Sequence, residues 1–94
     1  MIKDIFGKRL RKLRTEKAWS QDELVLKLGI SHKATISNWE KGKRFPEDLE
    51  ILIGICDLFG CTLDYLLGRS DVKNPFIDDA IIDMINVLKK HNYI

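Results

Sequence analysis

Apolar residues recur at helical spacing in several separate stretches of this chain, each bounded by residues that begin or end helices. In the first stretch, Phe6, Leu10 and Leu13 stand at positions i, i+4 and i+7. This is the single apolar stripe of an amphipathic helix, and it predicts a helix over residues 2–17. Apolar residues at helical spacing return in five later stretches, so the sequence predicts an all-α fold.

The second predicted helix begins near Ser20. Glu23 follows three residues later, which is the capping-box spacing that marks a helix start. Gly29 suits the left-handed backbone conformation that ends a helix. Between these signals lies an apolar face formed by Leu24, Val25 and Leu28.

The third predicted helix is short and mostly polar. Ser31 is expected to cap it, and its only apolar positions are Ile36 and Trp39. Its remaining surface has small or hydrogen-bonding residues, with no acid before Glu40: His32, Lys33, Ala34, Thr35, Ser37, Asn38 and Lys41. A slender helix held by two apolar anchors suits insertion into the major groove of DNA. The pair of helices therefore predicts a helix-turn-helix.

Two more helices complete the predicted domain. Pro46 is expected to open the fourth helix, and Gly60 to end it. The expected core face of that helix consists of Leu49, Leu52, Ile53, Cys56 and Phe59. Thr62 is predicted to cap a short fifth helix that ends at Gly68.

A C-terminal amphipathic helix is predicted beyond a polar linker at residues 70–75. Asn74 and Pro75 have the residue types expected at the start of that helix. Its apolar stripe contains Ile77, Ile81, Met84, Ile85 and Leu88. The expected organisation is therefore a helix-turn-helix domain at 1–69, the linker, and a C-terminal helix at 76–94. This helix either pairs with a second copy as a dimerisation element, which we favour, or packs back on its own domain.

Four motifs in order give the chain a recognisable family pattern: RLRKLR, SQDELVLKLGIS, TISNWEKGKRFP and LFGCTLDYLLG. With them, residues 3–69 resemble the DNA-binding domain of the Cro/repressor-type, or Xre, helix-turn-helix regulators. The resemblance implies a five-helix, repressor-like domain. From Gly29 to Ile36 the chain advances one position more than is usual in the family, so the turn or the start of the recognition helix differs.

The resemblance also implies roles for individual residues. Arg14 would pair with Glu40, joining the first helix to the third. Counted back from the apolar anchors, the base-contacting positions are Lys33, Ala34 and Asn38. Thr35 and Ser37 flank them and can serve either a base or a phosphate. Counted forward from Gly29, the first base-contacting residue is His32 instead. The sequence does not decide between these two alignments of the recognition helix.

Phosphate contacts are expected around the same helix. The residues placed for them are Gln21, Ser37, Lys41, Lys43 and Arg44. For Gln21 this role comes from the resemblance, and the alternative is an ordinary exposed polar residue. In some relatives a basic residue at the place of Arg44 enters the minor groove.

Charge is unevenly distributed along the chain. Residues 1–45 contain twelve Lys and Arg against five Asp and Glu, whereas residues 46–94 contain four against nine. A basic half that includes the helix-turn-helix is expected of a phosphate-binding surface, and the alternative is a solvated basic face without a partner. No apolar run reaches membrane-spanning length, so we expect a cytoplasmic protein with no membrane partner. Cys56 and Cys61 are then expected to be buried thiols.

Two hypotheses of function follow. The leading one is a sequence-specific regulator of transcription that binds double-stranded DNA, most simply a repressor acting as a homodimer on a two-fold operator. The alternative is a protein-interaction module, such as an antitoxin or antagonist, whose last helix binds a partner protein. The sequence has no Gly-rich phosphate loop, metal-ligand quartet or nucleophile–base pair. It therefore predicts no enzyme, catalytic residue, metal site, cofactor or small-molecule substrate.

Overall fold

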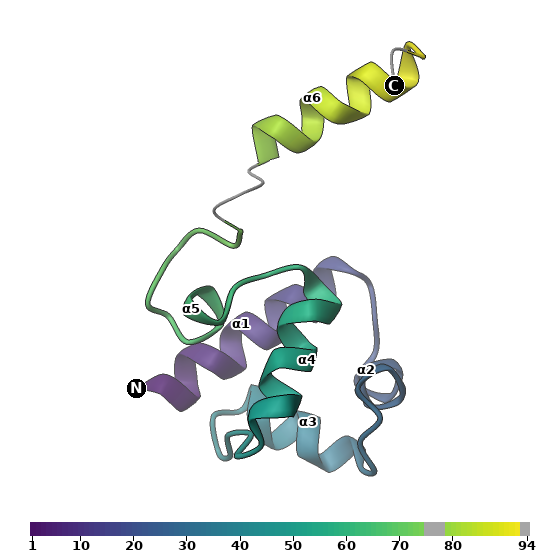
Figure 1. The fold of residues 1–94 in the computed structure, drawn as a ribbon. Coiled ribbons are helices and arrows are strands. Elements are labelled where there is room, and N and C mark those ends of the chain that lie inside the picture. The colour runs from purple at the N-terminus through teal and green to yellow at the C-terminus, as the bar shows by residue number, and fades with distance from the viewer. Residues whose placement is uncertain (75–78, 93–94) are drawn as a thin grey trace.

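A computed structural model describes residues 1–74 and 79–92, with side-chain detail in the last helix from residue 83 onward. In chain order the helices are α1 (Ile2–Glu16), α2 (Gln21–Leu28), α3 (Lys33–Glu40), α4 (Leu49–Phe59), α5 (Leu63–Leu66) and α6 (Asp79–Lys90). Figure 1 shows α1 to α5 gathered into one unit, with α6 standing apart from it. Since the described residues contain helices and no strands, the predicted all-α fold class is confirmed.

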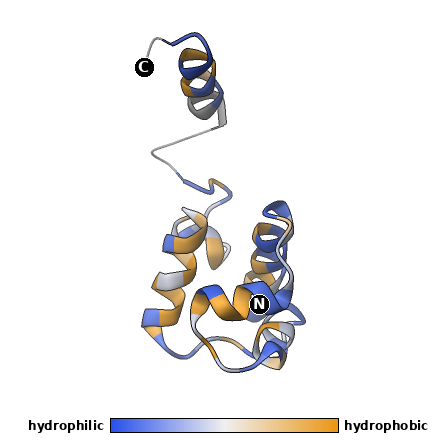
Figure 2. Ribbon diagram, turned by 90° about the vertical axis from the view of Figure 1, so that its right-hand side faces the viewer, coloured by the Kyte–Doolittle hydropathy of each residue, from blue (hydrophilic) through white to orange (hydrophobic). Residues whose placement is uncertain are grey.

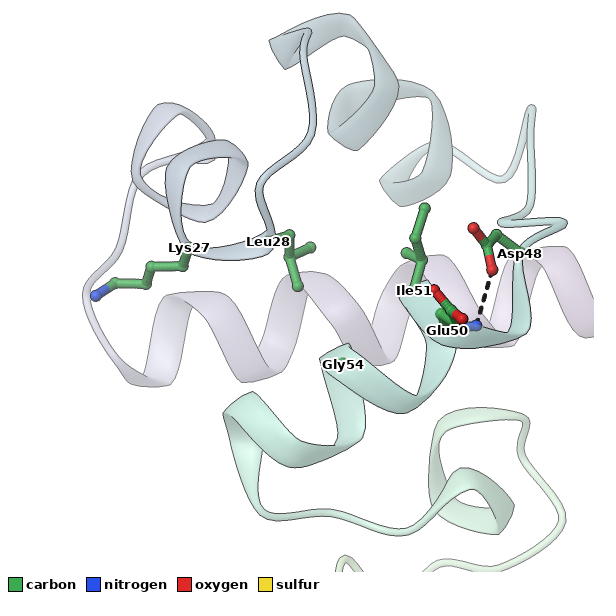
Figure 3. A pocket seen from close by; sticks show the side chains of 6 residues that line it. All are labelled: Lys27, Leu28, Asp48, Glu50, Ile51 and Gly54. Carbon is green, nitrogen blue, oxygen red and sulfur yellow. Dashed lines mark hydrogen bonds between the residues drawn. The ribbon is translucent and has the colours of Figure 1, made fainter.

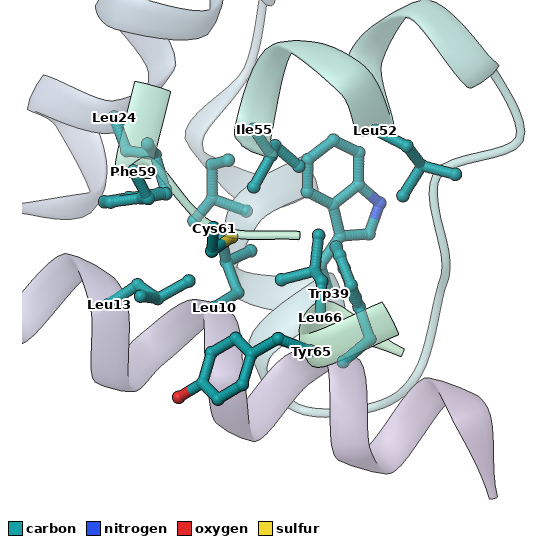
Figure 4. Close-up of a cluster of buried hydrophobic side chains, with 12 residues drawn as sticks. Leu10, Leu13, Leu24, Trp39, Leu52, Ile55, Phe59, Cys61, Tyr65 and Leu66 are labelled. Carbon is teal, nitrogen blue, oxygen red and sulfur yellow. The ribbon is translucent and has the colours of Figure 1, made fainter. Parts of the chain in front are cut away.

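One apolar core holds α1 to α5 together (Figure 4). The helix pairs that pack most closely are α1 with α3 and α5, α2 with α3 and α4, and α4 with α5. Phe6 of α1 is fully buried and meets the rings of Trp39 and Phe45 edge to face, at centroid distances of 6.2 and 5.1 Å. Helix α3 is consequently held from two sides, by α1 and by α2.

Several predicted helix ends are confirmed by their hydrogen bonds and backbone angles. The Ser20 hydroxyl accepts a hydrogen bond from the backbone N–H of Glu23 at 3.0 Å. The Thr62 hydroxyl accepts one from the backbone N–H of Tyr65 at 3.1 Å. Gly29, which ends α2, has φ of 68° and lies in the left-handed region.

The predicted start of α3 is wrong by one residue. Helix α3 begins at Lys33 with His32 at the N-cap, and no side chain caps it. The first turn closes through a hydrogen bond from the Thr35 N–H to the His32 carbonyl, 3.1 Å long. Ser31 therefore lies within the turn and does not cap the helix.

The predicted start of α4 is also wrong. Pro46 is buried in the loop that precedes the helix. The helix begins at Leu49, where the Asp48 carboxylate accepts a hydrogen bond from the Glu50 N–H at 2.9 Å. An aspartate that caps the helix directly is a stronger start signal than a proline upstream of it.

The predicted core face of α4 is partly wrong. Leu52 and Phe59 are buried as expected, and Ile55 is fully buried although it was not assigned to the core. Leu49 and Ile53 are instead 60% and 48% exposed. Most positions of this helix are apolar, so spacing alone does not decide which side is covered. The positions of α2 and α5 decide it.

The segment 70–74 lies against α1 and α5. The Arg9 guanidinium donates hydrogen bonds to the carbonyls of Tyr65 and Ser70 and to the carboxylate of Asp71, at 2.8 Å for the last. It also lies 4.3 Å from the centre of the Tyr65 ring. Lys73 forms a 2.9 Å ion pair with Glu16 at the end of α1. Contacts with the five-helix unit therefore continue beyond α5.

Helix α6 is amphipathic (Figure 2). Met84 and Val87 are 64% and 55% exposed, and Ile85 and Leu88 are half-buried. Pro75, Ile77 and the side chain of Ile81, which the sequence placed in this helix, lie outside the described residues. Among the described helices, none is long and apolar enough to cross a membrane.

Candidate nucleic-acid interface

Helix α3 is anchored through one side. Ile36 is fully buried and Trp39 is 5% exposed, as the sequence predicted for the two apolar positions. On α1, Gly7 is buried against the end of α3, where an added Cβ would overlap the carbonyl oxygen of Trp39 and lie 2.9 Å from that of Glu40. The absent side chain lets the two backbones meet. Sequence reasoning missed Gly7, although a glycine inside an amphipathic helix is itself a signal of close packing.

An ion pair joins α1 to the last residue of α3. Arg14 Nε and Nη2 donate to the two carboxylate oxygens of Glu40 at 2.7 and 2.9 Å, and Nη1 donates to the Trp19 carbonyl at 2.7 Å. The two charged side chains are 12% and 5% exposed. The hydrogen bonds to Glu40 raise the pKa of the Arg14 guanidinium, against the opposing effect of burial. The family resemblance implied an ion pair between these two residues, and in the structure the pair is bidentate.

Gln21 belongs to the same hydrogen-bond network. Its side-chain Nε2 donates to Glu40 Oε1 at 3.2 Å, and the residue is half-buried. The amide is therefore oriented by the end of α3 and is not an ordinary exposed polar group. It lies in the first turn of α2, where helix N–H groups favour an anion.

The side of α3 opposite its anchors faces outward. Since Ile36, Trp39 and Glu40 face inward, the helical period turns the following residues away from the core: Ala34, Ser37, Asn38 and Lys41. Ala34 and Lys41 are exposed, while Ser37 and Asn38 are half-buried. The outward surface is therefore narrow, with small or hydrogen-bonding residues in its middle.

The observed start of α3 places the remaining candidates at its edges. Lys33 is the first helical residue, 60% exposed and 3.9 Å from the Asp22 carboxylate of α2. Thr35 is half-buried beside the outward surface. His32 is exposed at the N-cap, before the helix starts. Lys33 and Ala34 are thus the first two residues of α3, and His32 precedes them.

Two exposed basic residues follow α3 in an ordered turn. Gly42, with φ of 74°, ends the helix, and its N–H donates to the Trp39 carbonyl at 3.1 Å. The N–H groups of Lys43 and Arg44 donate to the Asn38 carbonyl at 2.9 and 3.3 Å. These bonds close a Schellman-type end, so the backbone that bears both cationic side chains is fixed beside α3.

A hollow of about 280 Å³ lies between α2 and α4 (Figure 3). Its lining comprises Lys27, Leu28, Asp48, Glu50, Ile51 and Gly54. Asp48 and Glu50 are exposed. The hollow therefore has no convergent set of buried polar groups that would orient a small ligand.

The two cysteines are free thiols; Cys61 is buried as predicted, whereas Cys56 is half-buried. Burial raises the pKa of Cys61 to about 12, and the adjacent Cys56 adds to the increase. Burial also raises the pKa of Cys56. In the described part of the chain, no three His, Cys, Asp or Glu side chains are grouped to hold a metal ion.

Comparison with known proteins assigns this arrangement to a family. A family model described as a helix-turn-helix domain matches residues 7–72, which include all of α2 and α3. The chain belongs to the helix-turn-helix family of regulators. The Cro/repressor-type, or Xre, membership implied by the sequence motifs is thereby confirmed.

Curated relatives in this helix-turn-helix family are named as regulators of transcription. The HTH-type transcriptional regulator ImmR of Bacillus subtilis (strain 168) is 34% identical over 80 residues, covering 85% of this chain and 61% of that protein. AnsR of the same organism is 45% identical over 65 residues, covering 69% and 54%. The HTH-type transcriptional activator BcrR of Enterococcus faecalis is 39% identical over 89 residues, covering 95% and 41%. The chain thus spans 41% to 61% of the length of these three proteins.

A solved structure has the same helix-turn-helix fold. A chain of the SinR protein/SinI protein complex matches with a TM-score of 0.60 at 24% sequence identity. The match covers 92% of this chain and 76% of that chain. It supports the helical architecture.

Proposed function

We propose that this chain regulates transcription by binding double-stranded DNA sequence-specifically, with α3 in the major groove. The observation that supports this most directly is the outward surface of α3, which is narrow, polar and mounted on a rigid base. Gly7 and the Arg14–Glu40 ion pair fix the helix against α1. A fixed helix loses little conformational freedom on binding, which favours discrimination between sequences.

Each residue of the interface has a chemical role in this proposal. Asn38 pairs with adenine N6 and N7, Lys33 reaches guanine O6 or N7, and Ala34 contacts a thymine methyl group. Thr35 serves a neighbouring base, and His32 lies at the edge of the groove. The phosphate-binding residues are Gln21, Ser37, Lys41, Lys43 and Arg44.

The regulator is proposed to act as a homodimer with two-fold symmetry. Two copies related by a two-fold axis present two α3 helices to successive major grooves, about one helical turn of DNA apart. A dimer seated on an operator excludes polymerase from the same DNA, and the proposed mode is therefore repression. The relatives include a protein named an activator.

The experiment is selection of bound duplexes from a randomised pool at moderate salt. An enriched inverted repeat with half-site centres about 10 base pairs apart is expected. Asn38→Ala should lose preference at one base position, at a cost of about 1–3 kcal/mol. Lys43→Ala should weaken all sequences alike and reduce the slope of log affinity against log salt by about 1. Asp57→Asn, on the exposed side of α4, is the control and should change neither.

The second candidate is a protein-interaction module, favoured by the exposed Met84 and Val87 of α6. In that case α6 binds another protein, and the basic surface anchors the complex to DNA without reading sequence. Absence of any enriched motif, together with binding that falls steeply with salt, would refute the sequence-specific regulator. It would leave this second candidate.

A further inference from the structure

We propose that α6 pairs with α6 of a second copy of this chain in antiparallel orientation. The inference rests on the proposed homodimer and adds to it the surface and the direction of pairing. Three features support it: an uncovered apolar side of α6, a separation of charge along that helix, and the limited apolar lining of the hollow between α2 and α4.

The apolar side of α6 forms a continuous stripe. Met84 and Leu88 are four residues apart, and Val87 and Ile85 extend the stripe on either side. Met84 and Val87 are mostly exposed, and Figure 2 shows apolar and polar residues on different sides of the helix. A stripe of this kind gains free energy when another apolar surface removes it from water.

Charge is separated along the same helix. Asp79 and Asp83 belong to its first half, whereas Lys89 and Lys90 form its last turn. A parallel pair would bring acids beside acids and bases beside bases. An antiparallel pair brings the acidic half of each helix beside the basic half of its partner, and the helix dipoles also oppose one another. Both effects favour the antiparallel arrangement.

The spacing is suitable for these charges to select orientation. Asp83 and Lys89 are separated by about 9 Å along the helix axis, at 1.5 Å per residue. This is close to the Debye length of about 8–10 Å at moderate ionic strength. A partner helix in contact with α6 therefore interacts separately with its acidic end and its basic end. The preference for antiparallel over parallel pairing should decline as the salt concentration rises.

The main alternative is that α6 packs on its own domain, in the hollow between α2 and α4. That hollow is small, about 280 Å³, and its rim carries Lys27, Asp48 and Glu50 (Figure 3). Its apolar lining is limited to Leu28 and Ile51. It offers less apolar surface than the side of α6 formed by Met84, Ile85, Val87 and Leu88, and a second α6 offers the same four side chains.

The test is chemical cross-linking of full-length variants with a short bismaleimide reagent. Met84 lies near the middle of α6, and His91 directly follows its last residue, with its N–H bonded to the Val87 carbonyl at 3.2 Å. In a parallel pair each position meets its own counterpart. In an antiparallel pair centred near Met84, the two copies of residue 91 are separated by about 20 Å along the axis. Met84→Cys should therefore give a cross-linked dimer, and His91→Cys should not.

The parent chain, with its two native thiols, is the control and should give little cross-linked dimer. Cross-linking from both introduced cysteines would overturn the orientation while leaving the homodimer in place. A monomer by sedimentation, with no cross-link from either position, would refute both the pairing and the dimeric part of the proposed function. Binding of single half-sites by α3 is measured separately and would still test sequence-specific recognition.

A second measurement examines the charges. The double variant Lys89→Glu/Lys90→Glu makes both halves of α6 acidic, and its dimer dissociation constant should rise at least tenfold at low salt. Lys8→Glu/Lys12→Glu reverses the same number of exposed charges on α1 and should leave dimerisation unchanged. An equal effect of the two double variants would show that net charge governs association, and would overturn the pairing of opposite ends.

Discussion

Replacement of Arg14 by methionine should destabilise the domain far more than loss of a surface cation. Arg14 donates two hydrogen bonds to Glu40 and one to the Trp19 carbonyl, and both charged side chains are largely buried. Methionine keeps the stem but leaves the Glu40 carboxylate buried beside a single donor, the Gln21 amide. Removal of one partner of a buried ion pair costs about 3–5 kcal/mol.

The cost of Arg14→Met is measured by urea unfolding, followed by circular dichroism. With a slope of about 1.5 kcal/mol per molar urea for a small domain, a loss of about 3 kcal/mol lowers the midpoint by about 2 M. Lys12→Met is the matched control, since Lys12 is an exposed cation two positions earlier in α1. It should change the free energy of unfolding by less than about 0.5 kcal/mol.

The double variant Arg14→Met/Glu40→Leu separates the ion pair from the packing of its side chains. Without the carboxylate there is no unpaired buried charge, so the double variant should be more stable than Arg14→Met alone. The reasoning would be refuted if Arg14→Met cost no more than Lys12→Met. It would also be refuted if the costs of the two single substitutions simply added in the double variant.

Three further substitutions or reactions test other contacts. Gly7→Ala should lower the free energy of unfolding by about 1–3 kcal/mol, because its Cβ would overlap the α3 backbone. Gly54→Ala, which meets no atom within 4 Å, should leave thermal stability unchanged or raise it; equal losses would contradict the packing argument. Because the pKa of Cys61 is raised to about 12, its alkylation by iodoacetamide at pH 8 should be slow in the folded protein and rapid in guanidinium. Peptide mapping separates Cys61 from the half-buried Cys56, and rapid labelling of Cys61 in the folded chain would contradict its burial. Arg9→Gln should speed amide hydrogen exchange in residues 70–74 while the core amides stay protected, and unchanged exchange would show that Arg9 does not hold this segment.

The sequence by itself determined the local features of this protein. The caps at Ser20 and Thr62 and the left-handed Gly29 each depend on residues within one helical turn, so their signals are complete in the sequence. The same is true of the two anchors of the recognition helix, Ile36 and Trp39, because three-residue spacing puts both on one side. The pair of short helices, and the family, were therefore predictable.

Tertiary structure decided what depends on residues far apart in the chain. Helix α4 is apolar on most sides, and only its neighbours determine that Ile55 is covered while Ile53 is left exposed. In the sequence, Gly7 is a residue of low helix propensity within a predicted helix. In the fold, its missing side chain allows the backbone of α1 to contact the backbone at the end of α3. Gln21 is oriented by Glu40, nineteen positions away. Burial and hydrogen bonds between helices depend on how whole helices pack, and that information is not contained in any single turn of the chain.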